Sequence, residues 1–514
     1  MKKHFLCAAL LVLVCCIPQK MEGAITRIKV TDSNVSTKET FNPDTLYSRW
    51  AINSRLGSYS NKSSGGNPKL RGLNFTSPYG VTKATTDSWD YVPGLVARAV
   101  LKASEYYASE SFSTPWLEAV YNWADSKANG QELFTSSKKN DIDWLNAAKI
   151  FADLYKQKGS GTAGWCETQM TAAVTLLRDS HGRIPADNPL YLADAAGGFW
   201  HKDSYQYQMW CDGQYMGPAM WAEWLGTFKN SGYAGWATEW ADIANQLDIC
   251  CKYTYSVEDH LFFHAMNAYV NTASCPWAVA SGTQHSKEAW GRGAGWLFAA
   301  LVDILEYMPA GIDVKANFTY PDGVAATDVD SKTRLTYYLK LMADGLAARQ
   351  DASGCWPQLL RYDAGTTPSG ASNANYLESS ASSMFCYAYL KAVRLGLLSG
   401  TTIDKTSATV TYATVAKRGF EGVVNNFVCK QSDGSIFVIQ SCESAGLDGS
   451  RAGDAAYYLG NNNDTRINDA TEGKCLGPFI LAATEYERAY PPAAEPEPEP
   501  AGGECRCLRV TITE

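Results

Sequence analysis

Long amphipathic helical segments recur along almost the whole chain and limit the folds that it can adopt. Apolar residues return at three- and four-residue spacing, the period of one helix face, in twelve segments spread over roughly 450 residues. Strand-like alternation is sparse, and its best candidate is Ser435–Gln440, as part of a small hairpin. Neither a strict repeat nor a natural break divides the chain, so we expect a single all-α domain. A ring of six helical hairpins, an (α/α)6 barrel, is the simplest arrangement of twelve helices.

The expected helices are joined by loops rich in Gly, Asn, Asp and aromatic residues. They cover residues 44–56, 90–107, 114–127, 143–156, 166–178, 213–228, 236–253, 291–308, 332–349, 378–395, 407–424 and 474–487. Between the first two helices lies Gly57–Thr86, a long loop rich in Gly, Ser and Asn. Loops of this length are uncommon in compact domains and often border a binding site, so we expect this one at the rim of the site.

The N-terminus predicts export. Residues 1–24 are typical of a signal peptide, with Lys2 and Lys3 before the apolar run Phe5–Ile17 and the small pair Gly23-Ala24 at the end. The run is too short to span a bilayer, and no later segment is typical of a membrane span. Cys16 raises the alternative of a lipoprotein, but the residues before it lack the small side chain that such processing requires. We therefore expect export as a soluble protein, to a bacterial periplasm.

The remaining chain divides into three parts by composition. Residues 25–41 are mostly polar and are interpreted as a leader, and the helical domain is placed at 42–489. Residues 490–514 contain PPAAEPEPEP, which is typical of a stiff, solvated polyproline spacer. We interpret this last segment as a disordered tail outside the domain.

Charge and cysteine content narrow the partners that the protein can have. The net charge of −8 gives no basic character of the kind that binds nucleic acid, and an anionic ligand would need local cations. Of the 15 cysteines, three lie in the signal peptide, and none of the others has zinc-site spacing. HExxH, GxSxG and GxGxxG motifs are missing. We therefore expect no metal, no other cofactor and no nucleic acid, while the oligomeric state stays open.

The richest candidate site is Gly197–Trp224, GGFWHKDSYQYQMWCDGQYMGPAMWAEW. The polar residues of this segment that could take part in binding or catalysis are His201, Lys202, Gln208 and Asp212. They lie among tryptophans and tyrosines. Asp212 falls at a helix start, where Asp is a favoured cap, so capping is one interpretation. The other is a carboxylate above an aromatic surface that suits a sugar ring, with its pKa raised by poor hydration.

Two further motifs have both a structural and a functional interpretation. Asp143, in NDIDWLNAAK, is either a second helix cap or a second site carboxylate. Trp290–Trp296, WGRGAGW, opens a helix with three glycines, each costing roughly 0.5 to 1 kcal/mol relative to Ala. Tight helix packing or close approach to a ligand would offset that cost. Arg292 and Trp296 share a face, where a guanidinium matches a carboxylate and an indole stacks on a sugar.

These motifs resemble those of the unsaturated rhamnogalacturonyl hydrolases, glycoside hydrolase family 105, which are related to the unsaturated glucuronyl hydrolases. The central segment matches HKxxYxxQMWxDGxYM, and the Asp143 segment is similar to the family's LDxxNAGK. WGRGAGW resembles WGRGNGW, with Ala294 in place of the usual Asn, so any contact of that amide is lost here. WDYVPG and LFFHAMN are also similar to family segments, and the resemblance runs from about residue 44 to 486.

The resemblance implies a closed barrel and a reaction. Family members remove the unsaturated uronic acid from the non-reducing end of lyase-generated pectin and rhamnogalacturonan fragments, by hydration of a vinyl ether. Asp212 would donate a proton to C4 and then accept one from the water that adds at C5, and Asp143 would be the second catalytic carboxylate. The implied substrate-binding residues are Trp89, Tyr91, His201, Lys202, Gln208, His264, Arg292 and Trp296. A lone His such as His264 is equally often structural.

Two other functions suit the same residues. An inverting glycosidase would use Asp212 and Asp143 as acid and base about 6.5 to 9.5 Å apart and would act on saturated oligosaccharides. A non-catalytic sugar-binding protein of the cell surface would bind pectin fragments without changing them.

Overall fold

The computed structural model describes residues 27–28, 35–55, 89–270, 275–278, 284–431, 434–469 and 473–492. The expected signal peptide, the loop Gly57–Thr86 and residues 493–514 of the expected tail lie outside these ranges. Among the helices of the described ranges, none combines the length and the apolar character that crossing a membrane requires.

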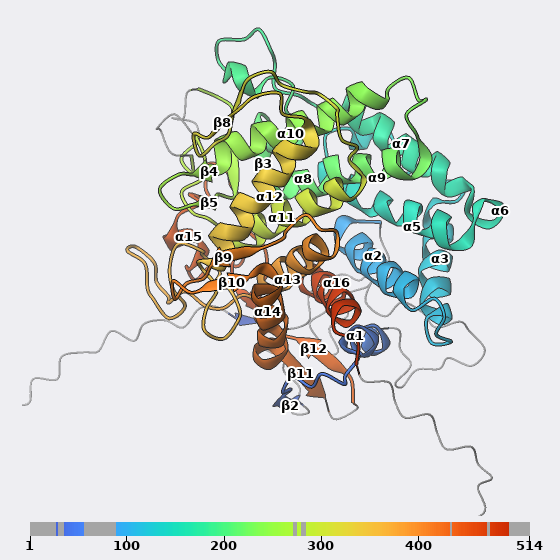
Figure 1. Ribbon diagram of the computed structural model, residues 1–514, viewed down its shortest axis with the longest axis vertical. Helices are drawn as coiled ribbons and strands as arrows, with labels where there is room; N and C mark the ends of the chain where they lie inside the picture. The colour runs from blue at the N-terminus through green and yellow to red at the C-terminus, as the bar shows by residue number, and fades with distance from the viewer. Residues whose placement is uncertain are drawn as a thin grey trace, which may run out of the picture.

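Two concentric rings of helices form the barrel (Figure 1). The inner ring consists of α2 (Tyr91–Tyr106), α5 (Lys149–Lys158), α8 and α9 (Cys211–Met216 and Pro218–Phe228), α11 (Gly291–Tyr307), α13 (Ser379–Arg394) and α16 (Gly473–Ala489). Each inner helix contacts the next, and α16 contacts α2, which closes the ring. Figure 1 shows α2, α16, α13 and α11 following one another around it. The expected (α/α)6 barrel is confirmed.

The outer ring covers the inner one. It consists of α1 (Tyr47–Arg55), α3 (Thr114–Ala128), α7 (Trp165–Ser180), α10 (Trp236–Thr254), α12 (Ser331–Ala347) and α14 (Tyr412–Phe427). These helices pack in turn on α16, α2, α5, α9, α11 and α13. In α3, Trp116, Val120 and Trp123 are buried at three- and four-residue spacing because a single stripe faces inward. By contrast, α11 is buried over nearly its whole length, as befits a helix enclosed on all sides.

Three expected helices are divided or begin several residues later in the structure. The segment expected at 213–228 is interrupted before Pro218, which lacks the backbone N–H of a continuous helix. The segment expected at 143–156 consists of α4 (Ile142–Leu145), a 3₁₀ turn (Asn146–Ala148) and α5. The helix expected from residue 407 begins at Tyr412, because β9 (Thr401–Ile403) and β10 (Thr409–Thr411) form a hairpin before it.

Short strands hold the N-terminal segment against the C-terminal third of the chain. β11 (Val428–Gln431) pairs antiparallel with β12 (Ile436–Val438), which confirms the hairpin expected near residues 435–440. β2 (Val35–Lys38) joins β11 as a third strand. β1 (Arg27–Ile28) pairs with β14 (Ile467–Asn468), which also pairs with β13 (Ser441–Cys442). The segment interpreted as a leader therefore adds a strand to two small sheets.

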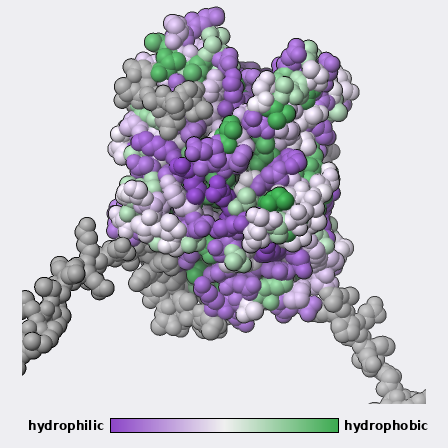
Figure 2. Space-filling model, turned by 60° about the vertical axis from the view of Figure 1, so that its left-hand side comes forward, coloured by the Kyte–Doolittle hydropathy of each residue, from purple (hydrophilic) through white to green (hydrophobic). Residues whose placement is uncertain are grey.

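The other short elements lie in the connections. They are α6 (Ser160–Ala163), α15 (Ala455–Tyr458), 3₁₀ turns at Ser136–Lys138, Ala193–Ala195 and Asp203–Tyr205, and the strand pairs β3 (Gln208–Trp210) with β6 (Ala265–Asn267), β4 (Tyr255–Ser256) with β5 (Leu261–Phe262), and β7 (Phe318–Thr319) with β8 (Ala325–Ala326). The face shown in Figure 2 is mostly hydrophilic, with hydrophobic residues only in small separate groups. The ten cysteines of the described ranges are buried free thiols, in agreement with their interpretation as small core residues.

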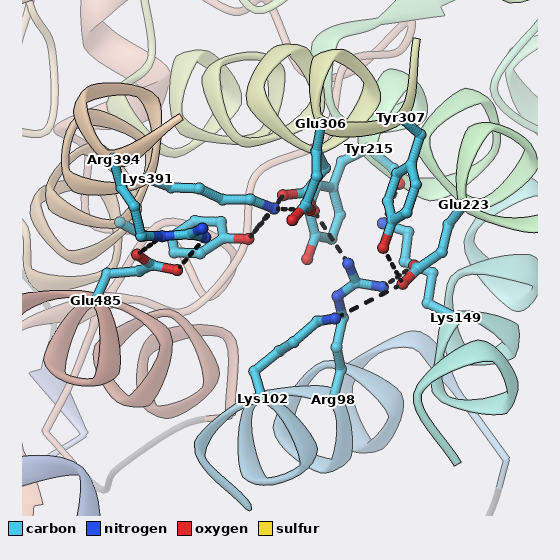
Figure 3. A network of polar contacts seen from close by, with 12 residues as sticks. Arg98, Lys102, Lys149, Tyr215, Glu223, Glu306, Tyr307, Lys391, Arg394 and Glu485 are labelled. Carbon is cyan, nitrogen blue, oxygen red and sulfur yellow. Dashed lines mark hydrogen bonds and ion pairs between the residues drawn. The ribbon is translucent and has the colours of Figure 1, made fainter. Parts of the chain in front are cut away.

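Four buried charged side chains cross the inner ring, and we call them the charged layer (Figure 3). Arg98 of α2 bonds to Glu223 of α9, and its Nη2 lies 3.4 Å from Asp303 Oδ2 of α11. Lys391 of α13 places its Nζ 2.6 Å from Asp303 Oδ1. The four side chains are at most 3% exposed. Because buried ions need partners of opposite charge, these contacts hold α2, α9, α11 and α13 together.

The charged layer divides the barrel into two ends. The N-terminal ends of the inner helices lie on one side of it. On the other side, towards their C-terminal ends, is a cavity of about 550 Å³ whose lining includes Lys102, Lys156, Glu306 and Arg488. That cavity is polar, and three of its cations pair with carboxylates: Lys102 with Asp153 at 2.5 Å, Lys391 with Glu306 at 2.8 Å and Arg394 with Glu485 at 2.7 Å.

The carboxyl of Glu487 joins α16 to α1 and makes stability depend on pH. It accepts hydrogen bonds from Ser48 and Tyr107, and burial raises its pKa from 4.5 to about 7. The folded state thus binds this proton more tightly, so the stability it supplies is complete below about pH 4.5 and is lost as the pH rises to about 7. We expect Glu487→Gln to increase the free energy of unfolding at pH 8 by ~2–3 kcal/mol.

Urea unfolding between pH 4.5 and 8 checks this expectation. Glu485→Gln is the matched control, because Glu485 lies in the same helix but pairs with Arg394 at 2.7 Å. That control should lower stability at every pH. A Glu487→Gln variant whose pH dependence equals that of the wild type would contradict the assignment.

Candidate active site

The position of Asp212 follows from the strand that precedes it. β3 runs directly into α8, so Asp212 lies in the first turn of α8, where exposed backbone N–H groups favour a carboxylate. Tyr207, with φ of 64°, turns the chain into this strand. The N-cap residue of α8 is Trp210, and in α4 it is Asp141, so neither Asp212 nor Asp143 is an N-cap. The capping interpretation is therefore wrong for both residues.

Asp212 faces His264, which in turn contacts Tyr458. The backbone N–H of Cys211 donates to the carbonyl oxygen of His264 at 2.9 Å and brings the two side chains together. His264 Nε2 lies 3.2 Å from Asp212 Oδ2, and His264 Nδ1 lies 2.8 Å from the Tyr458 hydroxyl. His264 is completely buried. One of the alternatives for this histidine, a purely structural role, does not account for a ring nitrogen directed at Asp212.

The pKa of Asp212 is lowered, whereas the sequence led us to expect that it would be raised. Burial raises it, but His264, and after it His201, more than compensate, so that the pKa lies below its ordinary value of 3.8. The expected upward shift is therefore wrong for the protein without a ligand, because the histidines on either side were not visible as neighbours in the sequence. Asp212 is a carboxylate near neutral pH.

A second cluster of charges surrounds Asp143. Lys202 Nζ lies 2.7 Å from Asp143 Oδ2 and 3.5 Å from Asp141 Oδ1. His201 Nε2 lies 3.4 Å from Asp143 Oδ1. Burial lowers the pKa of His201, while the charges of Asp143 and Asp212 oppose that effect. The Nδ1 of His201 is also close to Gly213, where an added Cβ would approach within 3.2 Å.

Unpaired polar atoms are concentrated at this place. Of the 21 buried side-chain atoms that lack an aligned hydrogen bond in the described ranges, five belong to this group: Asp141 Oδ1, Asp143 Oδ1, His201 Nδ1, Asp212 Oδ2 and His264 Nε2. More than about 90% of buried polar groups in folded proteins have a hydrogen-bond partner. Such a concentration indicates a site whose remaining hydrogen bonds go to a bound molecule or to water.

Aromatic rings enclose the same atoms. The imidazole of His201 stacks on Trp210, with centroids 4.6 Å apart and planes 6° apart. Tyr205 lies 4.6 Å from Trp210 on centroids, and Trp290 lies 4.6 Å from His264. Flat apolar rings beside a few polar groups are the usual surroundings of a sugar ring, so the expected aromatic surface is present.

The glycines of Trp290–Trp296 allow close packing of protein side chains, and approach to a ligand stays a prediction. A Cβ on Gly293 would lie 3.0 Å from the ring of His264, so that glycine gives the histidine room. Cβ atoms on Gly291 and Gly295 would meet Ala381 at 3.0 Å and Met384 at 2.8 Å, both on α13. Tight helix packing explains two of these glycines, and the approach of a site residue explains the third.

Two residues expected to bind substrate, Trp89 and Trp296, are packed in the hydrophobic core, so their contacts with substrate stay predictions. Trp89 stacks on Trp123 and Phe151, with centroids 5.6 and 5.3 Å away, within the hydrophobic core. Trp296 packs on Tyr215 at 4.8 Å and is 2% exposed. The sequence patterns did not separate these core rings from the rings of the site, since both follow the same helical spacing.

Three other residues expected to bind substrate form hydrogen bonds with protein groups: Arg292, Gln208 and Tyr91. Arg292 Nη1 donates to the carbonyl oxygen of Cys442 at 2.6 Å, and the side chain is buried. Gln208 Oε1 accepts from Trp210 Nε1 at 3.1 Å. Tyr91 is the half-buried first residue of α2 and accepts a hydrogen bond from Asn146 through its carbonyl oxygen. Their expected contacts with substrate stay predictions.

Two residues of the site region have no distinctive sequence signal. Asp90 caps α2, and burial raises its pKa, with Asp143 adding to the effect through like charge. Tyr458 lies in a short helix almost at the end of the domain. A capping Asp and one Tyr of a Tyr pair are too common in sequences to be singled out, and only the fold brings them to Asp143 and His264.

Comparison with known proteins supports the same assignment. The model of Glycosyl Hydrolase Family 88 matches residues 74–490. A solved family 105 glycoside hydrolase of C. acetobutylicum ATCC 824 is 29% identical, with a TM-score of 0.59 over 78% of this chain and 95% of that chain. This structure confirms the resemblance to family 105.

Curated proteins match over shorter stretches. Protein Atu3128 of Agrobacterium fabrum is 31% identical over 225 residues, which are 43% of this chain and 80% of that protein. The unsaturated 3S-rhamnoglycuronyl hydrolase of Alteromonas sp. is 27% identical over 172 residues, 33% of each protein. Because the family model matches most of its length, the chain belongs to glycosyl hydrolase family 88 and is a glycoside hydrolase.

Proposed function

We propose that this hydrolase removes the unsaturated (4-deoxy-4,5-ene) uronic acid from the non-reducing end of lyase-generated pectin and rhamnogalacturonan oligosaccharides. The observation that carries the proposal is the half-buried Asp212 carboxylate, whose Oδ2 lies 3.2 Å from His264 Nε2 and lacks an aligned hydrogen bond. The family 105 relative and the relative named unsaturated 3S-rhamnoglycuronyl hydrolase support it.

The proposed reaction is hydration of the C4=C5 double bond. The carboxyl proton of Asp212 moves to C4, and a water oxygen bonds to C5 while its proton returns to the Asp212 carboxylate. The resulting hemiketal opens at the bond between C5 and the ring oxygen, and the neighbouring sugar leaves from C1. One side chain thus acts first as acid and then as base, and no proton is gained or lost by the protein overall.

The lowered pKa of Asp212 places a condition on this reaction. A carboxylate must be protonated before it can donate, so the rate should fall as the pH rises above the Asp212 pKa. A bound uronate adds a second negative charge near Asp212 and thereby raises its pKa. Binding of an anionic substrate therefore helps to make the acid form that the first step needs.

A panel of oligosaccharides tests the proposal. Unsaturated lyase products are expected to lose the ultraviolet absorbance of the conjugated acid when the enzyme is added, and saturated oligosaccharides of the same length are expected to be unchanged. Chromatography of the released sugars identifies the preferred fragment. Cleavage of the saturated compounds would instead support the inverting glycosidase, and binding of both without cleavage would support the sugar-binding protein.

The N-terminal segment adds a proposal about location. The composition of residues 1–24 supports export, and we propose the periplasm of a bacterium as the place of action. Fractionation of cells that express the full chain, followed by mass measurement of the mature N-terminus, tests it; the full-length chain in the cytosolic fraction would contradict it.

A further inference from the structure

Tyr458 is the one residue of the Asp212 group that comes from the last part of the domain. It ends the short helix α15, whose start is capped by the Asp454 side chain. Its hydroxyl lies 2.8 Å from His264 Nδ1, and its ring stacks on Trp290 with centroids 6.1 Å apart. Tyr458 is fully buried. A contiguous row of three side chains therefore runs from Tyr458 through His264 to Asp212.

The proton positions in this row depend on which atom of the Tyr458–His264 pair donates. Burial raises the pKa of Tyr458 well above 10, so its hydroxyl keeps its proton. A phenol that donates to Nδ1 makes that nitrogen the acceptor, and neutral imidazole then carries its only proton on Nε2. This N–H is the group 3.2 Å from Asp212 Oδ2.

We propose that Tyr458 is a positioning residue, whose hydroxyl fixes the Nε2–H tautomer of His264 and thereby keeps an N–H group directed at Asp212. The inference rests on the proposed function of Asp212. In the other tautomer, a nitrogen lone pair would face a carboxylate oxygen, and the two would repel. The carboxyl group would then be favoured in its protonated form, which can donate to Nε2.

Other ionisable groups surround the row on both sides. His201, Asp143 and Lys202 lie on the side of Asp212. Tyr457, Glu288 and Cys442 lie around Tyr458. Substitution of the Tyr458 hydroxyl leaves all these groups in place, so a change in the pH dependence of turnover reports on the row itself.

Tyr458→Phe is the decisive variant, because it keeps the ring that stacks on Trp290 and removes only the hydroxyl. We expect the pH at which kcat/KM falls to move upwards by about one unit. Without the Tyr458 hydroxyl, His264 can adopt the tautomer whose Nε2 accepts a hydrogen bond, and this tautomer favours the protonated form of Asp212.

Tyr457→Phe is the matched control. Tyr457 lies next to Tyr458 in the same helix, but its hydroxyl accepts from the backbone N–H of Gly446 at 2.9 Å and makes no contact with the histidine. This variant should keep the pH profile of the wild type. In a His264→Asn background, Tyr458→Phe should cause no further shift.

Nitrogen-15 spectra of histidine-labelled protein test the tautomer without reference to turnover. The chain has six histidines, and the His264→Asn variant identifies the signals of His264. We expect Nε2 to carry the proton in the wild type and the proton to be shared with Nδ1 in Tyr458→Phe. An unchanged tautomer together with an unchanged pH profile would overturn the inference. A wild-type enzyme that leaves every unsaturated oligosaccharide intact would instead overturn the proposed function, while the spectra would still decide the role of Tyr458.

Discussion

Asp212→Asn is expected to lower kcat by about 10²- to 10⁴-fold while the fold is kept. Asn has nearly the same shape as Asp, and its carbonyl oxygen can still accept from His264, which lies 3.2 Å from Asp212 Oδ2. It has no acidic proton for C4 and cannot take one from water, so both halves of the proposed reaction stop. The measurement is the loss of ultraviolet absorbance of an unsaturated oligosaccharide under saturating conditions.

The matched control for this substitution is Asp194→Asn. The Asp194 side chain is 68% exposed and pairs with Lys252 on the surface, so its loss should leave kcat and KM unchanged. Circular dichroism and the unfolding midpoint show whether both variants are folded. An Asp212→Asn enzyme that turns over at near the wild-type rate would exclude Asp212 as the acid.

Asp303→Asn is expected to lower the free energy of unfolding by about 3 to 5 kcal/mol. Asp303 is the shared partner of Arg98 and Lys391 in the charged layer, and its pKa is far below 3.8, chiefly because Lys391 and Arg98 outweigh the effect of burial. Without this charge, Arg98 keeps only Glu223 as a carboxylate partner, and Lys391 keeps only Glu306, at 2.8 Å. Urea unfolding at neutral pH measures the loss.

A double variant tests the same contribution if the Asp303→Asn protein is too unstable to measure. Asp303→Asn with Lys391→Met removes one charge of each sign, so the pair should be less destabilised than the sum of the single variants. Asp194→Asn again serves as control, because exposed ion pairs contribute only about 0–1 kcal/mol. Equal stability of Asp303→Asn and the wild type would show that the layer contributes nothing.

The sequence was a good guide to the scaffold because helices depend on local information. Spacing of apolar residues predicted each of the twelve helical segments, and the expected and observed ends of α11 differ by only one residue. The exceptions have local causes as well. Pro218 interrupts one segment, and the β9–β10 hairpin delays the start of α14. The spacing of apolar residues was sufficient to predict these helices. Closure of the ring was expected only from the family resemblance.

The site was predictable only in part, because its chemistry depends on contacts between distant segments. The motifs identified Asp212, Asp143, His201, Lys202 and His264, and the structure brings all of them together. They did not distinguish Trp89, which stacks in the core, from Trp210, which stacks on His201. The sign of the Asp212 pKa shift depended on two histidines whose positions no spacing rule gives.

The charged layer limits how a polysaccharide substrate can enter and leave the barrel. Arg98, Glu223, Asp303 and Lys391 lie across the inside of the barrel, between the helix ends that carry Asp212 and the opposite cavity. The barrel is therefore a blind cup and not a tunnel, and a polymer cannot thread through it. A molecule that enters the barrel at the Asp212 end must therefore leave by the same end.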